Sequence, residues 1–141
     1  ETALSGRGIE YLYAYWAEKE AEELRFTTAA EIGDAALSGD LLAEKAICQF
    51  FDILGSYIAD GILATGSRHA VYLSGGIVPK LLDLLPKSQF LARAGIRGVH
   101  SDYINSVPIH LVMDPYAGLS GAGYSALSRE LSHRTITSET A

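Results

Sequence analysis

A run of apolar residues that stops at two adjacent glycines constrains this chain most. Residues 71–80 read VYLSGGIVPK. The pattern predicts a buried strand, a break at Gly75 and Gly76, and a helix directly after it. Open α/β sheets bind ligands at such junctions, where backbone N–H groups point outwards and glycine permits close approach. A tight turn without a ligand explains the same residues, so both interpretations stay open.

Length, composition and charge narrow the class of protein. The 141 residues suit one domain, and the 48% of apolar residues suffice for a hydrophobic core. No stretch reaches the roughly 20 consecutive apolar residues of a membrane span, and no signal peptide is recognisable. The net charge of −6 argues against a nucleic-acid partner, which needs clustered Lys and Arg. The single cysteine, Cys48, predicts no internal disulfide and fits a cytoplasmic protein.

The first half of the chain is predicted to be helical. Ser5 can act as the N-cap of a first helix. One face of this helix carries apolar residues spaced at i, i+3, i+4 and i+7, namely Ile9, Leu12, Tyr13 and Trp16. Thr28 and Glu31 have the capping-box spacing and should start a short helix to about residue 37. Asp40 can cap the next helix, residues 41–65, whose polar residues form one narrow stripe. We therefore expect that helix to be buried nearly all round.

The second half alternates strands with helices. We expect strands at 69–73 and 108–113, helices at 78–85 and 116–131, an irregular segment at 88–106 with one turn of helix near Leu91, and a frayed tail at 132–141. The second strand is apolar enough to be buried on both faces. The crossover between the strands implies parallel pairing. Two strands make a poor sheet, so further strands are expected from an upstream segment.

Other motifs carry little chemistry. Residues 118–123, GLSGAG, have the wrong glycine spacing for a dinucleotide fingerprint, and small residues that let a helix approach the sheet are the better interpretation. The four histidines have no ligand spacing with one another or with Cys48, so no zinc site is predicted. No catalytic triad can be nominated from the sequence.

Taken in order, these segments resemble the C-terminal part of bacterial ATP-dependent glucokinases. Residues 1–9, ETALSGRGI, resemble the family's E-x-x-L-S-G-x-G-[LI] segment, and residues 32–40 resemble the short helix and turn that follow it. Residues 72–80 are similar to the adenosine motif, [AS]-G-G-I-V-P-[RK]. Residues 107–111 and 118–123 match the last strand and helix.

The resemblance implies an α/β fold, the incomplete C-terminal lobe of an actin-like ATPase (ribonuclease H-like) sugar kinase, with helices packed on a small parallel sheet. Residues 1–141 would be part of the C-terminal (large) lobe, with the N-terminal lobe and the catalytic Asp outside this chain. The implied activity transfers the ATP γ-phosphoryl group to the 6-hydroxyl of D-glucose, the first step of glycolysis. Mg²⁺ would be bound mainly by residues outside the chain, and the full-length enzyme would be a homodimer.

The resemblance also assigns site residues. Glu1 matches the glutamate that hydrogen-bonds a glucose hydroxyl. Gly75 and Gly76 match the glycines beside adenosine, with Ser74 and Ile77 flanking them. No catalytic residue and no metal ligand is implied within the chain, so these residues alone are predicted to be inactive, because phosphoryl transfer depends on the parts that lie upstream.

Two departures and two alternatives accompany this prediction. The family often carries Lys-Gly-Arg where this chain has Arg97, Gly98 and Val99, so the second basic residue is absent. Arg7 stands where relatives commonly have proline, and we do not predict it to be catalytic. The alternatives are a non-enzymatic sugar- or nucleotide-sensing regulator built on the same lobe, and a dimerisation module formed by the apolar helices. The sequence does not fix which hexose is selected. It also does not fix whether the phosphoryl donor is ATP, ADP or polyphosphate.

Overall fold

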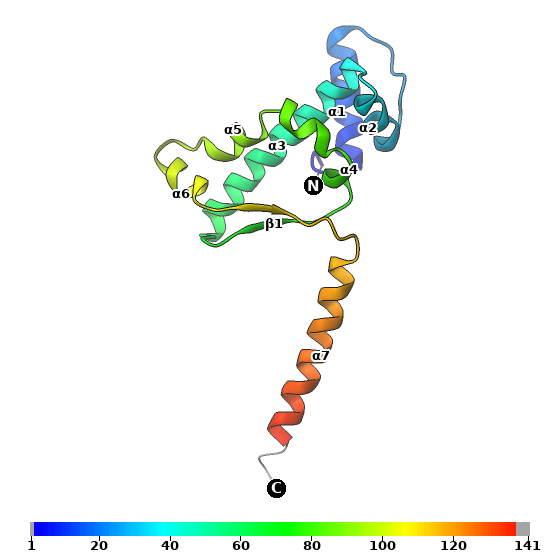
Figure 1. The fold of residues 1–141 in the computed structure, drawn as a ribbon. Coiled ribbons are helices and arrows are strands. Elements are labelled where there is room, and N and C mark those ends of the chain that lie inside the picture. The colour runs from blue at the N-terminus through cyan, green and yellow to red at the C-terminus, as the bar shows by residue number, and fades with distance from the viewer. Residues whose placement is uncertain (1, 138–141) are drawn as a thin grey trace. The chain divides into compact units, whose positions relative to one another are not determined.

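The computed structural model describes the backbone of residues 2–137 and the side chains up to residue 128. The chain divides into two compact units, Glu1–Leu111 and Val112–Ala141, and each is described by itself (Figure 1).

Three helices make up the first part of the first unit: α1 (Gly6–Glu20), α2 (Ala29–Leu37) and α3 (Leu41–Thr65). Each begins at the predicted cap. Ser5 Oγ accepts a hydrogen bond from the Gly8 N–H, and the Asp40 carboxylate accepts one from the Ala43 N–H. The capping box is complete, because Thr28 and Glu31 each accept a hydrogen bond from the other's backbone N–H. These caps fix where the helices start.

The core of this unit lies between α1, α2 and α3. Its largest fully buried side chains are Tyr13, Phe51, Ile9, Ile32, Ile47 and Ile62. The prediction that α3 is buried nearly all round is wrong, since Leu41 is 81% exposed and Tyr57 is 65% exposed. The reason is that neighbouring elements of the described chain cover only part of its circumference. By length and composition alone α3 could cross a membrane. Half of its apolar stretch is buried inside the protein, however, as in the core helix of a soluble protein, so the length and composition are weak evidence for a membrane span.

Two strands pair in parallel, as predicted: β1 (Val71–Leu73) and β2 (Ile109–Leu111), with Tyr72 opposite His110. Within residues 2–137 they form a sheet by themselves. The expectation that β2 is buried on both faces is wrong. Tyr72 is 69% exposed, and its ring stacks on that of His110 with the centroids 5.3 Å apart. The helices of the first unit cover only the face that carries Val71, Leu73 and Ile109.

Five short helices connect the strands: α4 (Ile77–Lys80), η1 (Leu82–Lys87), α5 (Phe90–Gly95), η2 (Gly98–His100) and α6 (Ser101–Asn105). The predicted helix 78–85 is split at Leu81, where the chain tightens into the 3₁₀ helix η1 that contains Pro86. The turn of helix predicted near Leu91 is confirmed by α5, but the rest of the segment 88–106, predicted as irregular, is also mostly helical. Tertiary contacts explain this: α5 packs so closely on α3 that a Cβ at Gly55 would lie 2.4 Å from the Phe90 carbonyl oxygen.

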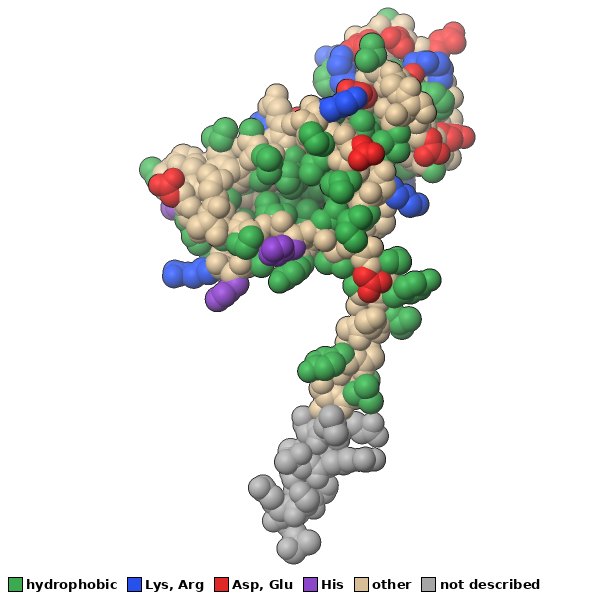
Figure 2. Space-filling view, in the orientation of Figure 1, with side chains coloured by type: hydrophobic (Ala, Val, Ile, Leu, Met, Phe, Trp, Pro, Cys, Tyr) green, Lys and Arg blue, Asp and Glu red, His purple; other side chains and the backbone are tan. Residues whose placement is uncertain are grey.

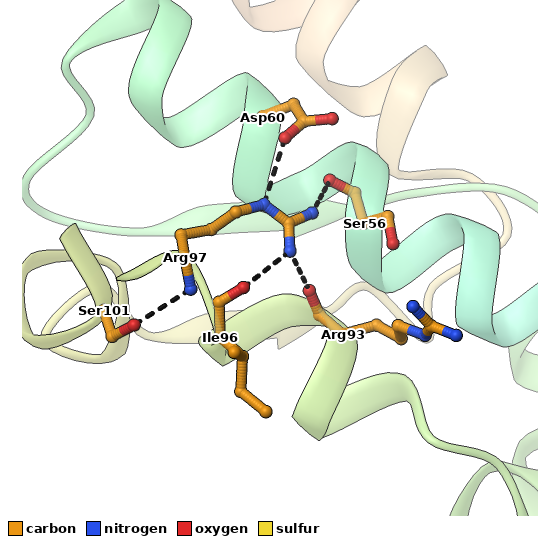
Figure 3. Close-up of polar contacts among 6 residues, drawn as sticks. All are labelled: Ser56, Asp60, Arg93, Ile96, Arg97 and Ser101. Atoms are coloured by element: carbon orange, nitrogen blue, oxygen red, sulfur yellow. Dashed lines mark hydrogen bonds and ion pairs between the residues drawn. The ribbon is translucent and has the colours of Figure 1, made fainter. Parts of the chain in front are cut away.

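Arg97 fastens this connection to α3 (Figure 3). Its Nε donates to Asp60 Oδ1 at 3.2 Å, and its Nη2 donates to the Ser56 carbonyl at 2.9 Å. Its Nη1 donates to the carbonyls of Arg93 and Ile96, at 2.9 and 2.8 Å, and its backbone N–H donates to Ser101 Oγ. The guanidinium therefore joins two elements that are far apart in the sequence.

The second unit contains the helix α7 (Ala117–Thr137). The Asp114 carboxylate accepts a hydrogen bond from the Tyr116 N–H at 2.8 Å, just ahead of the helix. The helix continues past residue 131, so the prediction of a frayed tail from residue 132 is wrong as far as Thr137; residues 138–141 lie outside the described part. No glycine or proline follows Gly123, which leaves no strong breaker to end the helix earlier. The close approach to the sheet predicted for residues 118–123 stays a prediction.

Candidate functional site

The two glycines of residues 71–80 form the junction between β1 and α4, as the sequence predicts. Ser74, Gly75 and Gly76 are exposed, and Ile77 is half-buried at the start of α4. The junction lies in the first unit, directly after the C-terminal end of β1 (Figure 1).

The two glycines differ in what the backbone requires of them. Gly75 has φ +141°, a backbone conformation that residues other than glycine rarely adopt. Gly76 has φ −84° and ψ −13°, which any residue can adopt. A Cβ added at Gly76 would meet no heavy atom of the described residues within 4 Å. The turn therefore explains Gly75, whereas nothing in the described chain requires glycine at position 76.

A cavity of about 650 Å³ opens beside Gly76. It is lined by Ile9 of α1, by Ala29, Ala30, Gly33, Asp34 and Leu37 of α2, and by Gly76, Ile77, Lys80 and Leu81. Most of these residues are apolar or lack a side chain, which suits a flat, largely apolar ligand with a few polar groups.

Contacts within the first unit hold the walls of this cavity in place. Glu10 Oε1 accepts a hydrogen bond from the Ala29 N–H at 3.2 Å and so ties the first turn of α2 to α1. A Cβ at Gly33 would lie 3.0 Å from Leu81 Cδ2, so α2 and the end of α4 pack tightly. The cavity wall is thus built from elements that the core already fixes.

The cavity has two ionisable side chains among the residues that line it, Asp34 and Lys80. Both are exposed at its edge. Asp34 lies in the last turn of α2, and its carbonyl accepts hydrogen bonds from the N–H and the hydroxyl of Ser38. Its carboxylate forms no hydrogen bond or ion pair with residues 2–128. These two side chains are the charged groups that a ligand in the cavity could meet.

A second hollow lies on the inner side of the sheet, between β1, β2 and α5, and it is lined entirely by apolar side chains (Figure 2). Its volume is about 180 Å³. Its lining residues offer no polar side chain to orient a ligand.

The predicted sugar contact, Glu1, lies outside the described residues. The segment after it is described and folds back over α1: a Cβ at Gly8 would lie 2.1 Å from the Ala3 carbonyl oxygen. Arg7 is exposed and donates a hydrogen bond to the Tyr11 hydroxyl at 3.1 Å. Because Gly8 has no Cβ, the chain immediately after Glu1 can lie closely against the start of α1.

The structure brings only part of the predicted nucleotide set to the cavity. Of the described residues, Gly76 and Ile77 line it, whereas Ser74 and Gly75 form the turn that leads to it. Neither the wall provided by α2 nor Lys80 was predicted from the sequence as part of the site. A signal was available, because Ala29, Ala30 and Gly33 leave one side of a short helix without bulky side chains.

Metal binding is the other chemistry to consider. Among the described residues, no group of three or more His, Cys, Asp or Glu side chains could hold a metal ion. Cys48 is half-buried, and its burial, with nearby Glu44 and Asp52, raises the pKa of the thiol, which keeps it protonated near neutral pH.

A strand-to-helix glycine junction beside an apolar cavity is typical of nucleotide-binding α/β proteins. The family model for glucokinase matches residues 1–129, and the chain therefore belongs to the glucokinase family.

Individual relatives agree with this assignment. The chain is 40% identical over 122 residues to the glucokinase of Caulobacter sp. (strain K31), a match that covers 86% of this chain and 37% of that one. It is 34% identical to the glucokinase of Helicobacter pylori (strain P12), covering 96% of this chain and 42% of that one. It superposes on the crystal structure of a glucokinase from an Antarctic psychrotroph with a TM-score of 0.76 at 33% identity, over 82% of this chain and 36% of that chain. The fold is thus that of a sugar kinase, and the chain spans about 37–42% of the length of these curated relatives.

Proposed function

We propose that this chain supplies the adenosine-binding wall of an ATP-dependent glucokinase, which transfers the γ-phosphoryl group of ATP to the 6-hydroxyl of D-glucose. The observation that carries the proposal is Gly76. Its backbone conformation is ordinary, and no atom of the described residues lies within 4 Å of the place its Cβ would take, yet it borders the cavity. Because Gly76, unlike Gly61, borders the cavity, we explain its missing side chain by a ligand that approaches the backbone closely.

In this proposal, Gly76 and Ile77 form the shelf for the purine and ribose, and Ser74 and Gly75 form the turn that sets its height. The wall of α2 closes the other side of the base. Glu1 hydrogen-bonds a glucose hydroxyl, and the contact between Ala3 and Gly8 fixes the segment behind it. The chain therefore positions both substrates, and none of its described residues is assigned to the chemistry of transfer.

The two-stranded sheet supports the view that the chain is part of a larger lobe. Tyr72 and His110 leave one face of the sheet exposed, and a two-stranded sheet is rarely stable by itself. We infer that upstream strands complete a ribonuclease H-like sheet in the C-terminal lobe of an actin-like ATPase. Mg²⁺ and the catalytic Asp would be supplied from outside the described residues, so the 141-residue chain alone would be inactive. The complete enzyme would be a cytoplasmic homodimer.

The test uses a chimera in which residues 1–141 replace the matching segment of the Caulobacter sp. glucokinase. In this chimera, Gly76→Val should raise the KM for ATP and leave the KM for glucose nearly unchanged, because the new side chain fills the shelf. Gly61→Ala is the matched control: Gly61 also has open space around its missing Cβ, but it lies on α3 and not among the residues that line the cavity. An ATP KM that does not respond to Gly76→Val would refute the proposed placement.

A further inference from the structure

We propose that the Asp34 carboxylate accepts a hydrogen bond from the exocyclic amine of adenine and so sets the base selectivity of the nucleotide site. This inference rests on the proposed function, because it assumes that the cavity beside Gly76 receives the base.

The composition of the cavity leaves few groups that could read a base. Of its lining residues, only Asp34 and Lys80 have ionisable side chains, and the others are apolar or glycine. An apolar wall binds any purine or pyrimidine face and discriminates little between them. Selectivity must therefore come from a polar group at the edge of the cavity. Among the residues that line the cavity, Asp34 carries the one carboxylate. In its ionised form a carboxylate accepts hydrogen bonds and donates none.

The position of Asp34 is unfavourable for the chain itself. It lies in the last turn of α2, where the helix dipole disfavours a negative charge, and that turn has no basic residue to compensate. The carboxylate forms no hydrogen bond or ion pair with the described residues, although the Asp34 carbonyl accepts from Ser38. The side chain thus weakens its own helix without a compensating contact. Conflicts of this kind between local preference and structure are expected at binding sites.

The chemistry of the base edges explains what such a carboxylate recognises. Adenine presents an amine donor at its 6-position, whereas guanine presents a carbonyl acceptor there. An ionised carboxylate attracts the amine and repels the carbonyl. Because Asp34 is exposed, we expect about tenfold discrimination, at the low end of the range for a hydrogen bond to a charged group.

Lys80 provides the contrast within the same cavity. It projects from α4, carries the opposite charge and is also exposed. An ammonium group can lie over the face of any base or attract any triphosphate, so its contribution does not depend on the 6-amine. Removal of Lys80 should weaken all nucleotides by a similar factor, and removal of Asp34 should weaken only those with the amine.

The experiment compares ATP with purine riboside 5′-triphosphate, which lacks only the 6-amine, in the chimera described above. In Asp34→Ala, kcat/KM for ATP should fall about tenfold, while kcat/KM for the purine analogue stays constant. Asp34→Asn, which keeps an acceptor oxygen without the charge, should lie between. Lys80→Met should lower both values equally. The melting temperature of Asp34→Ala should be unchanged or higher, because a charge unfavourable to α2 is removed.

Equal effects of Asp34→Ala on both nucleotides, or no effect on either, would overturn the inference. A second measurement separates this failure from a failure of the proposed function. Binding of adenosine and of purine riboside to the chimera is followed by saturation-transfer NMR, which needs no phosphoryl transfer. A preference for adenosine that disappears in Asp34→Ala supports the inference even if the chimera is inactive, and the absence of any preference contradicts it.

Discussion

Gly8 and Ala3 lie so close together that a Cβ on Gly8 would stand 2.1 Å from the Ala3 carbonyl oxygen. The segment that leads from Glu1 into α1 is thereby held against the first turn of the helix. A methyl group at position 8 would force this segment away, and the displacement would move the residue that we assign to glucose.

Gly8→Ala should therefore raise the KM for glucose in the chimera by about tenfold or more, since small displacements of positioning groups have large effects. Overpacking should also destabilise the fold by about 1–3 kcal/mol. The matched control is Gly6→Ala, because a Cβ there makes an ordinary contact at 3.6 Å with Ala29 Cβ. Steady-state kinetics and thermal unfolding measure both effects. Equal glucose KM values for the two variants would show that the segment does not position a sugar contact.

Two glycines of α3 should respond to alanine with opposite signs. Gly55→Ala would place a methyl group 2.4 Å from the Phe90 carbonyl oxygen. The overpacking penalty of about 1–3 kcal/mol should outweigh the gain in helix propensity of about 1 kcal/mol. Gly61→Ala meets open space, so it should stabilise the chain by up to about 1 kcal/mol. Chemical denaturation of the chimera measures both changes, and a Gly55→Ala variant as stable as the parent chimera would contradict the close packing of α5 on α3.

The contribution of Arg97 should come mainly from its bonds to backbone carbonyls. Arg97 donates to the carbonyls of Ser56, Arg93 and Ile96, whereas its ionic partner Asp60 is 70% exposed. Exposed ion pairs contribute about 0–1 kcal/mol, so Asp60→Asn should have little effect. Arg97→Ala should destabilise by about 2–3 kcal/mol, because the carbonyls of Arg93, Ile96 and the partly buried one of Ser56 all lose a charged donor. Arg97→Lys should rescue little, since an ammonium cannot reproduce the planar fork. Similar unfolding free energies for Asp60→Asn and Arg97→Ala would contradict this division.

Glu31 should make stability depend on pH in the acid range. Hydrogen bonds from the backbone N–H groups of Thr27 and Thr28 hold the pKa of Glu31 below its ordinary value of 4.5. Because the folded pKa is lowered, the contribution is fully present above the unfolded pKa and is lost as the pH falls through the folded pKa. Urea unfolding midpoints between pH 6 and pH 3 should therefore fall less steeply for Glu31→Gln than for the unchanged chain. Parallel curves would show that the capping box does not couple to folding.

Features encoded within a few residues were predictable from the sequence. The caps at Ser5, Thr28 and Asp40 were predicted because each satisfies N–H groups of its own first turn. The segment 88–106 was predicted only in part, as one turn of helix near Leu91, since its helices depend on Gly55 and on the hydrogen bonds of Arg97 to residues far away in the sequence. The prediction that the strands are buried failed for a related reason, because a pattern of apolar residues does not show which faces of a sheet other elements cover.

The candidate site was predictable in the same partial way. The sequence pointed to the pair of glycines, but only the backbone dihedral angles separate Gly75, which the turn requires, from Gly76, which it does not. The wall provided by α2 depends on how that helix packs against Leu81, and spacing alone does not give this contact. Glu1, assigned from the family resemblance, lies outside the described residues and stays a prediction.

The most direct test of the central claim is the ATP dependence of the Gly76→Val chimera. We predict that the KM for ATP rises about tenfold or more, a loss of about 1.4 kcal/mol in binding, with the KM for glucose and the melting temperature nearly unchanged. An ATP KM equal to that of the Gly61→Ala control would contradict the claim that the backbone at Gly76 is kept bare for a nucleotide.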